Sequence, residues 1–507
     1  MTLGSTYGVS LMGLNGNLIN IEVDIGDGIP GYTLLGLPDL ALSESRDRIR
    51  SAIINSAERW PQKKVTVSLS PAWLPKAGSH FDLPIALALL AAQGTIPRVL
   101  LSTTVFFGEL SLDGRIRSSR GVLPAVIALR ESVISTVVVP EENFREAQLV
   151  KSLTIIPART LKDVLTWLRT GTTPEQPELL SCHNDITHKD FSDVLGHEEA
   201  RYAMEVAAVG GHHLFMVGPP GTGKTMLAER FPSILPPLTD DESLTVSAIH
   251  SLAGTLDDRG LMTREPPFIA PHHTSSRVAL VGGGSQGIKP GACSLAHRGI
   301  LFIDEAPECA VGVLDALRQP LESGEITISR AIGSATFPAQ FTLILAANPC
   351  PCGRFAGRGR HCECTSVQIR RYLNKLSGPL LDRIDIRLFV QSPSRESLSS
   401  QTLGEASAQI RERVITARMR TQERLKDCGV LRNSEIPATL LRNEFPAEKS
   451  AMAFLHGELE KENITARGFH KLLRVAWSIT DLHGNSRPTL SDVHRAMKLR
   501  EGLERYS

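Results

Sequence analysis

The order of apolar and polar positions divides the chain into three parts. In the first part, strand-like and helix-like patterns alternate. Residues 65–69 alternate apolar and polar side chains, which predicts a half-buried strand, and residues 43–57 place apolar side chains at helical spacing. Beyond about residue 400 the spacing is helical, with apolar positions at i, i+3 and i+4 over residues 469–482 and a helix-rich composition over residues 406–426.

The middle part has the pattern of an α/β domain. Three short apolar runs, over residues 214–217, 299–303 and 341–347, read as buried strands, and residues 226–231 read as the first turns of a helix. A polar, proline-rich stretch over residues 171–178 precedes this part. We therefore expect an N-terminal α+β domain over residues 1–170, a linker over 171–189, an α/β core over 190–395 and a helical C-terminal domain over 396–507.

A phosphate-binding loop joins the first of these strands to the helix. The pattern is G-x-x-x-x-G-K-[ST], whose glycines let backbone N–H groups surround phosphates, whose lysine adds a positive charge and whose final hydroxyl reaches Mg²⁺. The alternative is a Gly/Pro turn with a chance lysine. The predicted nucleotide-binding residues are Gly218, Pro219, Pro220, Gly221, Thr222, Gly223, Lys224 and Thr225.

The other two strands end at polar residues that suit ATP hydrolysis. Asp304 is expected to hold Mg²⁺ with Thr225, and Glu305 to act as the general base that polarises the attacking water. Asn348 ends the third strand and would orient the same water, although an asparagine here also fits a plain Asn-Pro turn. The sequence therefore predicts an ATP- and Mg²⁺-dependent hydrolase.

Composition narrows the class of protein further. The 507 residues carry a net charge of +1, so any nucleic-acid contact must use a local basic patch. The N-terminus lacks a secretory signal pattern, and the longest apolar run, residues 83–92, is too short to span a bilayer and predicts a buried helix. We expect a cytoplasmic protein with no membrane partner.

Four of the eight cysteines are grouped in one loop. Cys350, Cys352, Cys362 and Cys364 form two C-x-C arms that can supply a tetrahedral thiolate site for Zn²⁺. Arginines between the arms, at 354, 358 and 360, would favour thiolates. The alternative is a reduced, cysteine-rich loop without metal.

Several segments together resemble one family, the magnesium-chelatase-like AAA+ ATPases of the ComM/YifB group. The matching segments are Leu-Gly-Leu-Pro (35–38), Ala-Pro-His-His-Thr-Ser (270–275), Ser-Leu-Ala-His (294–297), Asn-Pro-Cys-Pro-Cys-Gly (348–353), Leu-Asp-Arg-Ile-Asp (381–385) and Ala-Arg-Gly-Phe-His (466–470). The resemblance implies a Lon-protease-like (ChlI-type) N-terminal domain, an AAA+ core with a parallel sheet, a helical lid and a homo-hexameric ring. It also implies a branch-migration helicase of the kind used in natural transformation, acting on single-stranded or branched DNA.

The resemblance gives roles to two arginines. Arg383 matches the arginine finger, which reaches the nucleotide of a neighbouring subunit. Arg467 matches the sensor-2 arginine, which is expected to come from the helical lid onto the nucleotide. From the sequence alone, Arg383 fits an ion pair with Asp382 or Asp385 better than it fits an arginine finger, and Arg467 fits a charge at a helix start.

The N-terminal domain departs from proteolytic relatives. Where those use a Ser–Lys dyad, this chain has His80 at the serine position, with Ser79 one residue away, and Ala125 at the lysine position. Without a base beside a hydroxyl there is no activated nucleophile, so we expect a binding or assembly module. Arginines 115, 117 and 120 form either a phosphate-binding cluster or a solvated turn.

Three functions remain open at this stage. We favour an ATP-driven motor on DNA, whose channel loops would include residues 271–277 and 282–284, unless these are a mere Gly-rich connector. The alternatives are a chelatase-type ATPase subunit that assists metal insertion and a Lon-like ATP-dependent protease, which the missing dyad disfavours.

Overall fold

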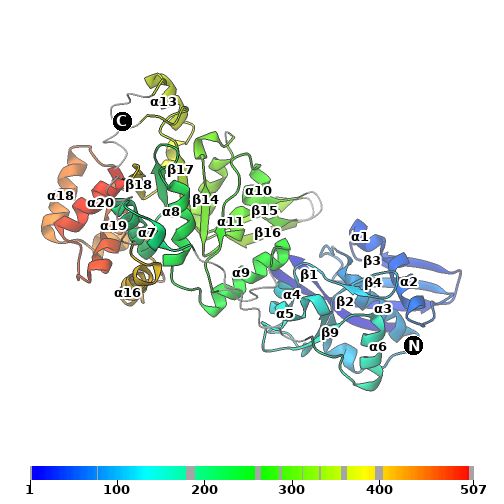
Figure 1. Cartoon of the computed structure of the whole chain (residues 1–507). Coiled ribbons are helices and arrows are strands. Elements are labelled where there is room, and N and C mark those ends of the chain that lie inside the picture. The colour runs from blue at the N-terminus through cyan, green and yellow to red at the C-terminus, as the bar shows by residue number, and fades with distance from the viewer. Residues whose placement is uncertain are drawn as a thin grey trace.

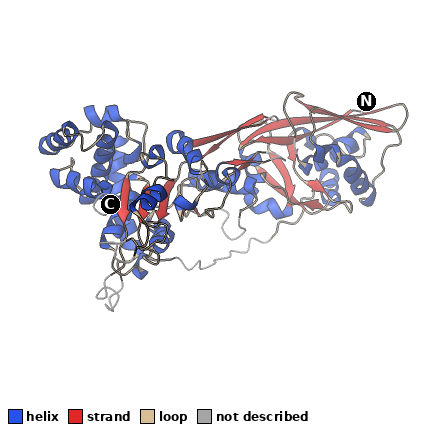
Figure 2. Ribbon diagram, turned by 90° about the horizontal axis from the view of Figure 1, so that it is seen from above, coloured by secondary structure: helices blue, strands red, loops and turns tan. Residues whose placement is uncertain are grey.

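The computed structural model describes most of the chain. The described residues are 3–76, 78–177, 189–256, 264–284, 288–310, 312–330, 333–355, 362–393 and 404–501. The expected linker over 171–189 falls largely outside them, as do Arg358 and Arg360 of the cysteine loop. A strand-rich N-terminal domain and a helical C-terminal domain lie at opposite ends of the molecule, with the α/β core between them (Figures 1 and 2).

The N-terminal domain is built on a seven-stranded mixed sheet of order β3-β4-β2-β1-β5-β8-β9. Only the β1–β2 and β2–β4 pairs are antiparallel. Its strands are β1 (Leu3–Met12), β2 (Asn15–Gly26), β3 (Gly31–Leu35), β4 (Lys64–Ser70), β5 (Thr104–Phe106), β8 (Thr136–Pro140) and β9 (Thr154–Ala158), and a small hairpin pairs β6 (Glu109–Leu110) with β7 (Ile116–Arg117).

Helices cover one face of this sheet along its whole width and the other face mainly over β1, β5, β8 and β9, so β2 and β4 are buried on one side only. One face packs on α2, α3 and α6, and the other on α4 and α5. Every residue of α3 is buried, as its uniformly apolar sequence predicts. The helices are α1 (Leu40–Ser43), α2 (Ser45–Asn55), α3 (Asp82–Ala92), α4 (Val122–Ile127), α5 (Phe144–Ala147) and α6 (Leu161–Thr170).

The core contains a five-stranded parallel sheet of order β11-β14-β17-β10-β18. Alternate side chains enter two separate hydrophobic clusters, with Leu214 and Met216 on one face and Phe215 and Val217 on the other. The strands are β11 (Phe268–Ile269), β14 (Ile300–Ile303), β17 (Thr342–Ala347), β10 (Leu214–Val217) and β18 (Ile386–Phe389). The three strands expected from the apolar runs are therefore present and adjacent.

Helices and two hairpins surround the core sheet. The hairpins pair β12 (Gly282–Gly283) with β13 (Lys289–Pro290) and β15 (Glu325–Arg330) with β16 (Gly333–Pro338). The helices are α7 (Glu198–Gly210), α8 (Lys224–Arg230), α9 (Asp240–Ala253), α10 (Arg277–Val281), α11 (Ala292–Leu295), α12 (Arg318–Ser323), α13 (Ser366–Leu373) and α14 (Gly378–Leu381).

The C-terminal region is helical and shares a hydrophobic cluster with one face of the core sheet. Its central helix, α19 (Ala466–His483), buries twelve of eighteen residues and contacts α7 of the core. The other helices are α16 (Ser407–Leu425), α17 (Ala438–Asn443), α18 (Lys449–Glu460) and α20 (Leu490–Glu501).

The N-terminal domain and the core meet along α9. Leu244 and Ala248 of α9 belong to the same hydrophobic cluster as Val122 and Val126 of α4. At the end of α9, the backbone N–H of Gly121 donates to the carbonyl of Ser251 at 3.2 Å. Figure 1 shows α9 reaching from the core to α4 and α5.

Candidate nucleotide site and cysteine cluster

The phosphate-binding loop connects β10 to α8 at the carboxyl end of the parallel sheet, where ligands bind in α/β domains. Two glycines are required by its geometry. A Cβ on Gly218 would lie 2.3 Å from the carbonyl oxygen of Val390, and Gly223 caps α8 with a positive φ of 84°. The loop therefore holds its backbone close to β18 and turns sharply into the helix.

Lys224 folds back over this loop. Its Nζ donates to the carbonyl oxygens of Gly218 at 2.6 Å and Pro219 at 2.9 Å, and to Oδ1 of Asn348 at 3.3 Å. Burial lowers the pKa of Lys224, and the nearby carboxylates of Asp304 and Glu305 oppose that shift. Phosphate oxygens would give this ammonium stronger, charged acceptors than the carbonyls do.

The residues expected to hold Mg²⁺ are in direct contact. Thr225 donates its hydroxyl to Oδ2 of Asp304 at 2.8 Å, so a hydroxyl and a carboxylate oxygen meet beside Lys224. Oxygen donors of this kind suit Mg²⁺, which binds through one or two protein ligands, waters and the phosphates of its nucleotide. The donor set therefore fits the metal.

Glu305 occupies a strained position at the end of β14. Its φ of 49° lies in the left-handed region, which costs a non-glycine residue about 1–3 kcal/mol. Its backbone N–H donates to Oδ1 of Asp304 at 2.8 Å, which holds the turn. The strain directs two successive carboxylates towards the same edge of the sheet, where a metal ligand and a general base are both needed.

One further residue at this site was missed by the sequence analysis. His273 places Nδ1 3.2 Å from Oε2 of Glu305. The sequence analysis assigned residues 271–277 to a channel loop, and the paired histidines at 272 and 273 were the available signal. The loop therefore touches the expected general base, and α10 begins within the same segment, at Arg277.

Arg383 and Arg467 lie away from the phosphate-binding loop of their own chain. Arg383 pairs with Glu322 and donates to the carbonyl of Pro379, whereas Arg467 pairs with Asp382 at 2.5 Å and approaches Glu322 at 3.8 Å. The residues that follow, at 385 and 386, bond to His213 at the start of β10.

Both guanidinium groups are thus near the amino ends of β10 and β18, at the sheet edge opposite the loop. The alternative partners expected for Arg383, Asp382 and Asp385, are not its partners: Glu322 is. Arg467, which is expected to come from the helical lid onto a nucleotide, is held at this edge by its pair with Asp382.

The four cysteines of the loop after β17 come together. The Sγ atom of Cys350 lies 3.3 Å from that of Cys352 and 3.6 Å from that of Cys362, and all four Sγ atoms, including that of Cys364, lie within 4.8 Å of one another. Tetrahedral zinc with Zn–S bonds of about 2.3 Å requires S···S separations of about 3.8 Å. The cluster has the chemistry and the spacing of a four-thiolate zinc site.

Local hydrogen bonds and burial set the thiol pKa values of this cluster apart. The pKa of Cys352 is lowered to about 6, chiefly because the backbone N–H of Arg354 bonds to its sulfur. Burial raises the pKa of Cys350 and of Cys362.

The cysteine loop also packs against the phosphate-binding loop. A Cβ on Gly353, whose φ is 73°, would lie 2.7 Å from Cγ of Pro220. The cysteine cluster thus packs against the phosphate-binding loop and follows directly after Asn348.

The N-terminal domain contains no Ser–Lys dyad among its described residues. His80 is half-buried, bonds through Nε2 to the carbonyl of Val9 at 3.0 Å, and has its pKa lowered by desolvation to about 4. Ser79 bonds to Glu109, and Ala125 is buried in α4. Of the arginines, Arg115 pairs with Asp113, Arg117 donates to Ser111, and Arg120 lies against Gly254 at the end of α9.

Comparison with known proteins places this architecture in one family. Residues 190–398 match "Magnesium chelatase, subunit ChlI", residues 21–143 match "Subunit ChlI of Mg-chelatase", and residues 404–500 match its C-terminal part. The chain is 47% identical to an uncharacterized protein of Mycobacterium tuberculosis over 99% of both chains. It is 41% identical to the competence protein ComM of Haemophilus influenzae over 98% of both, and 39% identical to YifB of Escherichia coli over 99% of this chain and 97% of YifB.

The chain belongs to the magnesium-chelatase ChlI family. The resemblance to ComM and YifB is therefore confirmed over the full length, together with the fold class: a ChlI domain with a mixed sheet, a parallel AAA+ core and a helical C-terminal region. As an AAA+ ATPase of this family, the protein uses ATP and Mg²⁺. Within the described part of the chain, no helix is both long and apolar enough to cross a membrane.

Proposed function

We propose that this ATPase is a DNA motor that works as a homo-hexameric ring and moves branched junctions by ATP-driven translocation. The proposal rests first on the separation, within one chain, of the residues expected to bind and hydrolyse ATP from the two arginines expected to assist hydrolysis. Lys224, Asp304 and Glu305 stand at one edge of the sheet, and Arg383 and Arg467 near the opposite edge. A ring in which the arginine edge of one subunit faces the loop of the next would complete every site, and we extend the trans assignment from Arg383 to Arg467.

DNA is supported as the substrate by relatedness and by a basic groove. ComM, with which the chain shares 41% identity, is a competence protein by name. A groove of about 340 Å³ between α10, α12 and the β15–β16 hairpin is lined by Arg277 and Arg330, among other residues. Arginines on a loop and a hairpin suit sequence-tolerant contacts to phosphates. Since α10 follows the loop that carries His273, DNA at this groove would sit close to the general base.

The test of this function is a strand-exchange assay. Purified protein, ATP and Mg²⁺ are added to a fluorescently labelled four-way or three-strand junction, and ATP hydrolysis is measured with and without DNA. We expect ATP-dependent release of strands and DNA-stimulated hydrolysis, both weakening steeply as salt rises, because phosphate contacts release counterions. Arg277→Gln should reduce the stimulation of ATP hydrolysis by DNA. Arg264 is an exposed arginine that pairs with Asp240, so Arg264→Gln should not change that stimulation. Hydrolysis that no DNA stimulates, with no strand exchange, would instead favour a chelatase-type ATPase subunit.

The cysteine cluster is proposed to bind one structural Zn²⁺. Protein purified without added metal should contain about one zinc per chain, because four thiolates complete one tetrahedral shell. Cys352→Ser and Cys362→Ser should lose the metal, whereas Cys428→Ser, a free cysteine outside the cluster, should keep it. Elemental analysis combined with thiol titration decides the point. A zinc-free protein in which the four cysteines of the cluster react as free thiols under reducing conditions would contradict the zinc site.

A further inference from the structure

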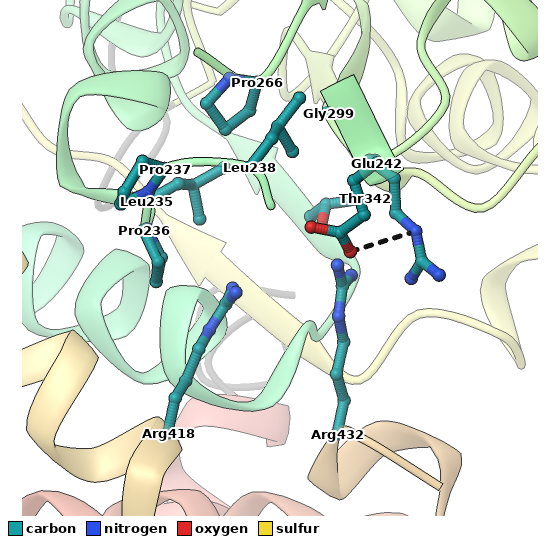
Figure 3. A pocket seen from close by; sticks show the side chains of 11 residues that line it. Leu235, Pro236, Pro237, Leu238, Glu242, Pro266, Gly299, Thr342, Arg418 and Arg432 are labelled. Carbon is teal, nitrogen blue, oxygen red and sulfur yellow. Dashed lines mark ion pairs between the residues drawn. The ribbon is translucent and has the colours of Figure 1, made fainter. Parts of the chain in front are cut away.

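A second cationic site lies where the core, α9 and the C-terminal region meet. A pocket there is lined by Arg298 of the core and by Arg418 and Arg432 of the C-terminal region, and its single lining carboxylate is that of Glu242, on α9. Figure 3 shows Arg418 and Arg432 rising side by side from separate elements towards Glu242 and Thr342. Thr342 begins β17, so the pocket opens at the amino edge of the sheet, opposite the phosphate-binding loop.

The charges in this pocket do not balance. Glu242 pairs with Arg298 at 3.2 Å, the dashed line in Figure 3, although the geometry leaves Nε of Arg298 without a hydrogen bond in the described part of the chain. Arg418 donates to the carbonyl of Ala208 at 2.9 Å through Nε, a neutral acceptor. The guanidinium group of Arg432 forms no hydrogen bond or ion pair with any described residue, and only its backbone carbonyl accepts a hydrogen bond, from the N–H of Glu435 at 3.1 Å.

One further carboxylate acts on these arginines. The charge of Glu435 acts on Arg418 and Arg432, but its side chain forms an ion pair with neither of them and accepts the backbone N–H of Leu431 at 3.2 Å. Burial, followed by the charge of Arg432, lowers the pKa of Arg418 to about 9. Burial, followed by the charges of Arg298 and Arg432, lowers the pKa of His297 to about 3. Enclosed guanidinium groups whose charge is not compensated are costly, and a bound anion would remove that cost.

We infer that this pocket binds a small tetrahedral oxyanion of the phosphate class, held by Arg298, Arg418 and Arg432. The planar forks of guanidinium groups match the oxygens of phosphate and give charge-assisted hydrogen bonds. The cavity has a volume of about 30 Å³, room for about two water molecules, so a compact anion fits and a nucleoside does not. Pro236, Pro237 and Pro266 enclose the pocket.

Such an anion would join three parts of the molecule. Its ligands come from the segment before β14, from α16 and from the turn after α16, while Glu242 belongs to the helix that contacts the N-terminal domain. Its binding would therefore lock the C-terminal region onto the core without touching the residues that handle ATP. The binding site is independent of the proposed action on DNA.

The experiment measures binding of inorganic phosphate by calorimetry and by thermal unfolding, against chloride at equal ionic strength. Because phosphate is also a product of ATP hydrolysis, the measurement is made on the full-length protein and on Lys224→Ala, in which the phosphate-binding loop lacks its ammonium. We expect phosphate to bind and to raise the unfolding temperature in both. A second arm with sulfate distinguishes a general oxyanion site, where both bind, from one selective for phosphate.

Two variants test the pocket in opposite directions. In the Lys224→Ala background, Arg432→Gln should weaken phosphate binding about ten-fold or more, since one charge-assisted hydrogen bond is lost. Glu242→Gln should strengthen it, because the competing carboxylate disappears while a glutamine keeps the cap that this residue forms with Thr239 at the start of α9. Arg264→Gln, an exposed arginine near the same end of α9, is the matched control and should change nothing.

Three results would overturn the inference. They are phosphate stabilisation that vanishes in Lys224→Ala, equal affinity in Arg432→Gln, and no gain in Glu242→Gln. The first would place the anion on the phosphate-binding loop alone, and the others would make the arginines a structural cluster.

Discussion

Glu305→Gln is expected to bind ATP with near-normal affinity and to hydrolyse it about 10²–10⁴ times more slowly, the range for losing a general base. Glutamine keeps the size and hydrogen-bonding capacity of the side chain but cannot accept the proton of the attacking water. Lys224 and the Thr225–Asp304 contact remain, so nucleotide and Mg²⁺ binding should persist. Turnover and nucleotide binding are measured on the same preparation.

Two variants nearby act as controls for this result. Glu308→Gln changes an exposed carboxylate three residues further on, whose partner is Lys375, and should leave turnover unchanged. His273→Gln removes the ion pair to Glu305 but leaves the carboxylate, so its effect should be much smaller than that of Glu305→Gln. Normal turnover in Glu305→Gln would contradict the assignment of the general base.

Arg383→Ala should reduce hydrolysis by about 10³–10⁵ while leaving ATP binding intact, as arginine fingers do in other phosphoryl-transfer systems. Mixing it with Lys224→Ala should restore part of the activity, because an interface between the two variants can combine an intact loop with an intact arginine. Neither variant alone can build such a site. Hydrolysis of the mixture across a range of ratios, together with sedimentation, gives the measurement.

The ion pair between Arg383 and Glu322 offers a control for folding. Glu322→Gln breaks that pair but keeps the guanidinium, so it should retain most of the activity if Arg383 acts on a neighbouring nucleotide. If Arg383 were only structural, Glu322→Gln and Arg383→Ala would behave alike and mixing would restore nothing. A monomer that hydrolyses ATP at the full rate would also contradict the shared site.

The sequence predicted those features that depend on short stretches of chain. The strands before the phosphate-binding loop and before Asp304 follow from apolar runs, and the contact of Thr225 with Asp304 follows from placing both at one edge of a parallel sheet. The grouping of the four cysteines was also foreseen, because only nine residues separate the two arms.

The features that the sequence did not reveal join distant segments. The His273–Glu305 contact, the Glu322 pair of Arg383 and the pocket of three arginines each depend on how helices pack on the sheet. The spacing of apolar and polar residues does not predict which charged side chains form ion pairs. Charged residues are usually solvated, and their pairing depends on tertiary structure alone. The pairing of Arg467 with Asp382 was not foreseen for the same reason: a motif identifies a residue but not the charged groups that surround it.

The contact between the N-terminal domain and the core along α9 limits which fragments of this protein can be made. Leu244 and Ala248 are covered by α4, so a fragment that starts at the core would expose an apolar stripe on α9. An exposed stripe of that kind promotes aggregation. The first 170 residues therefore cover an apolar surface of the ATPase core, and activity that is lost on their removal would report first on the solubility of the fragment.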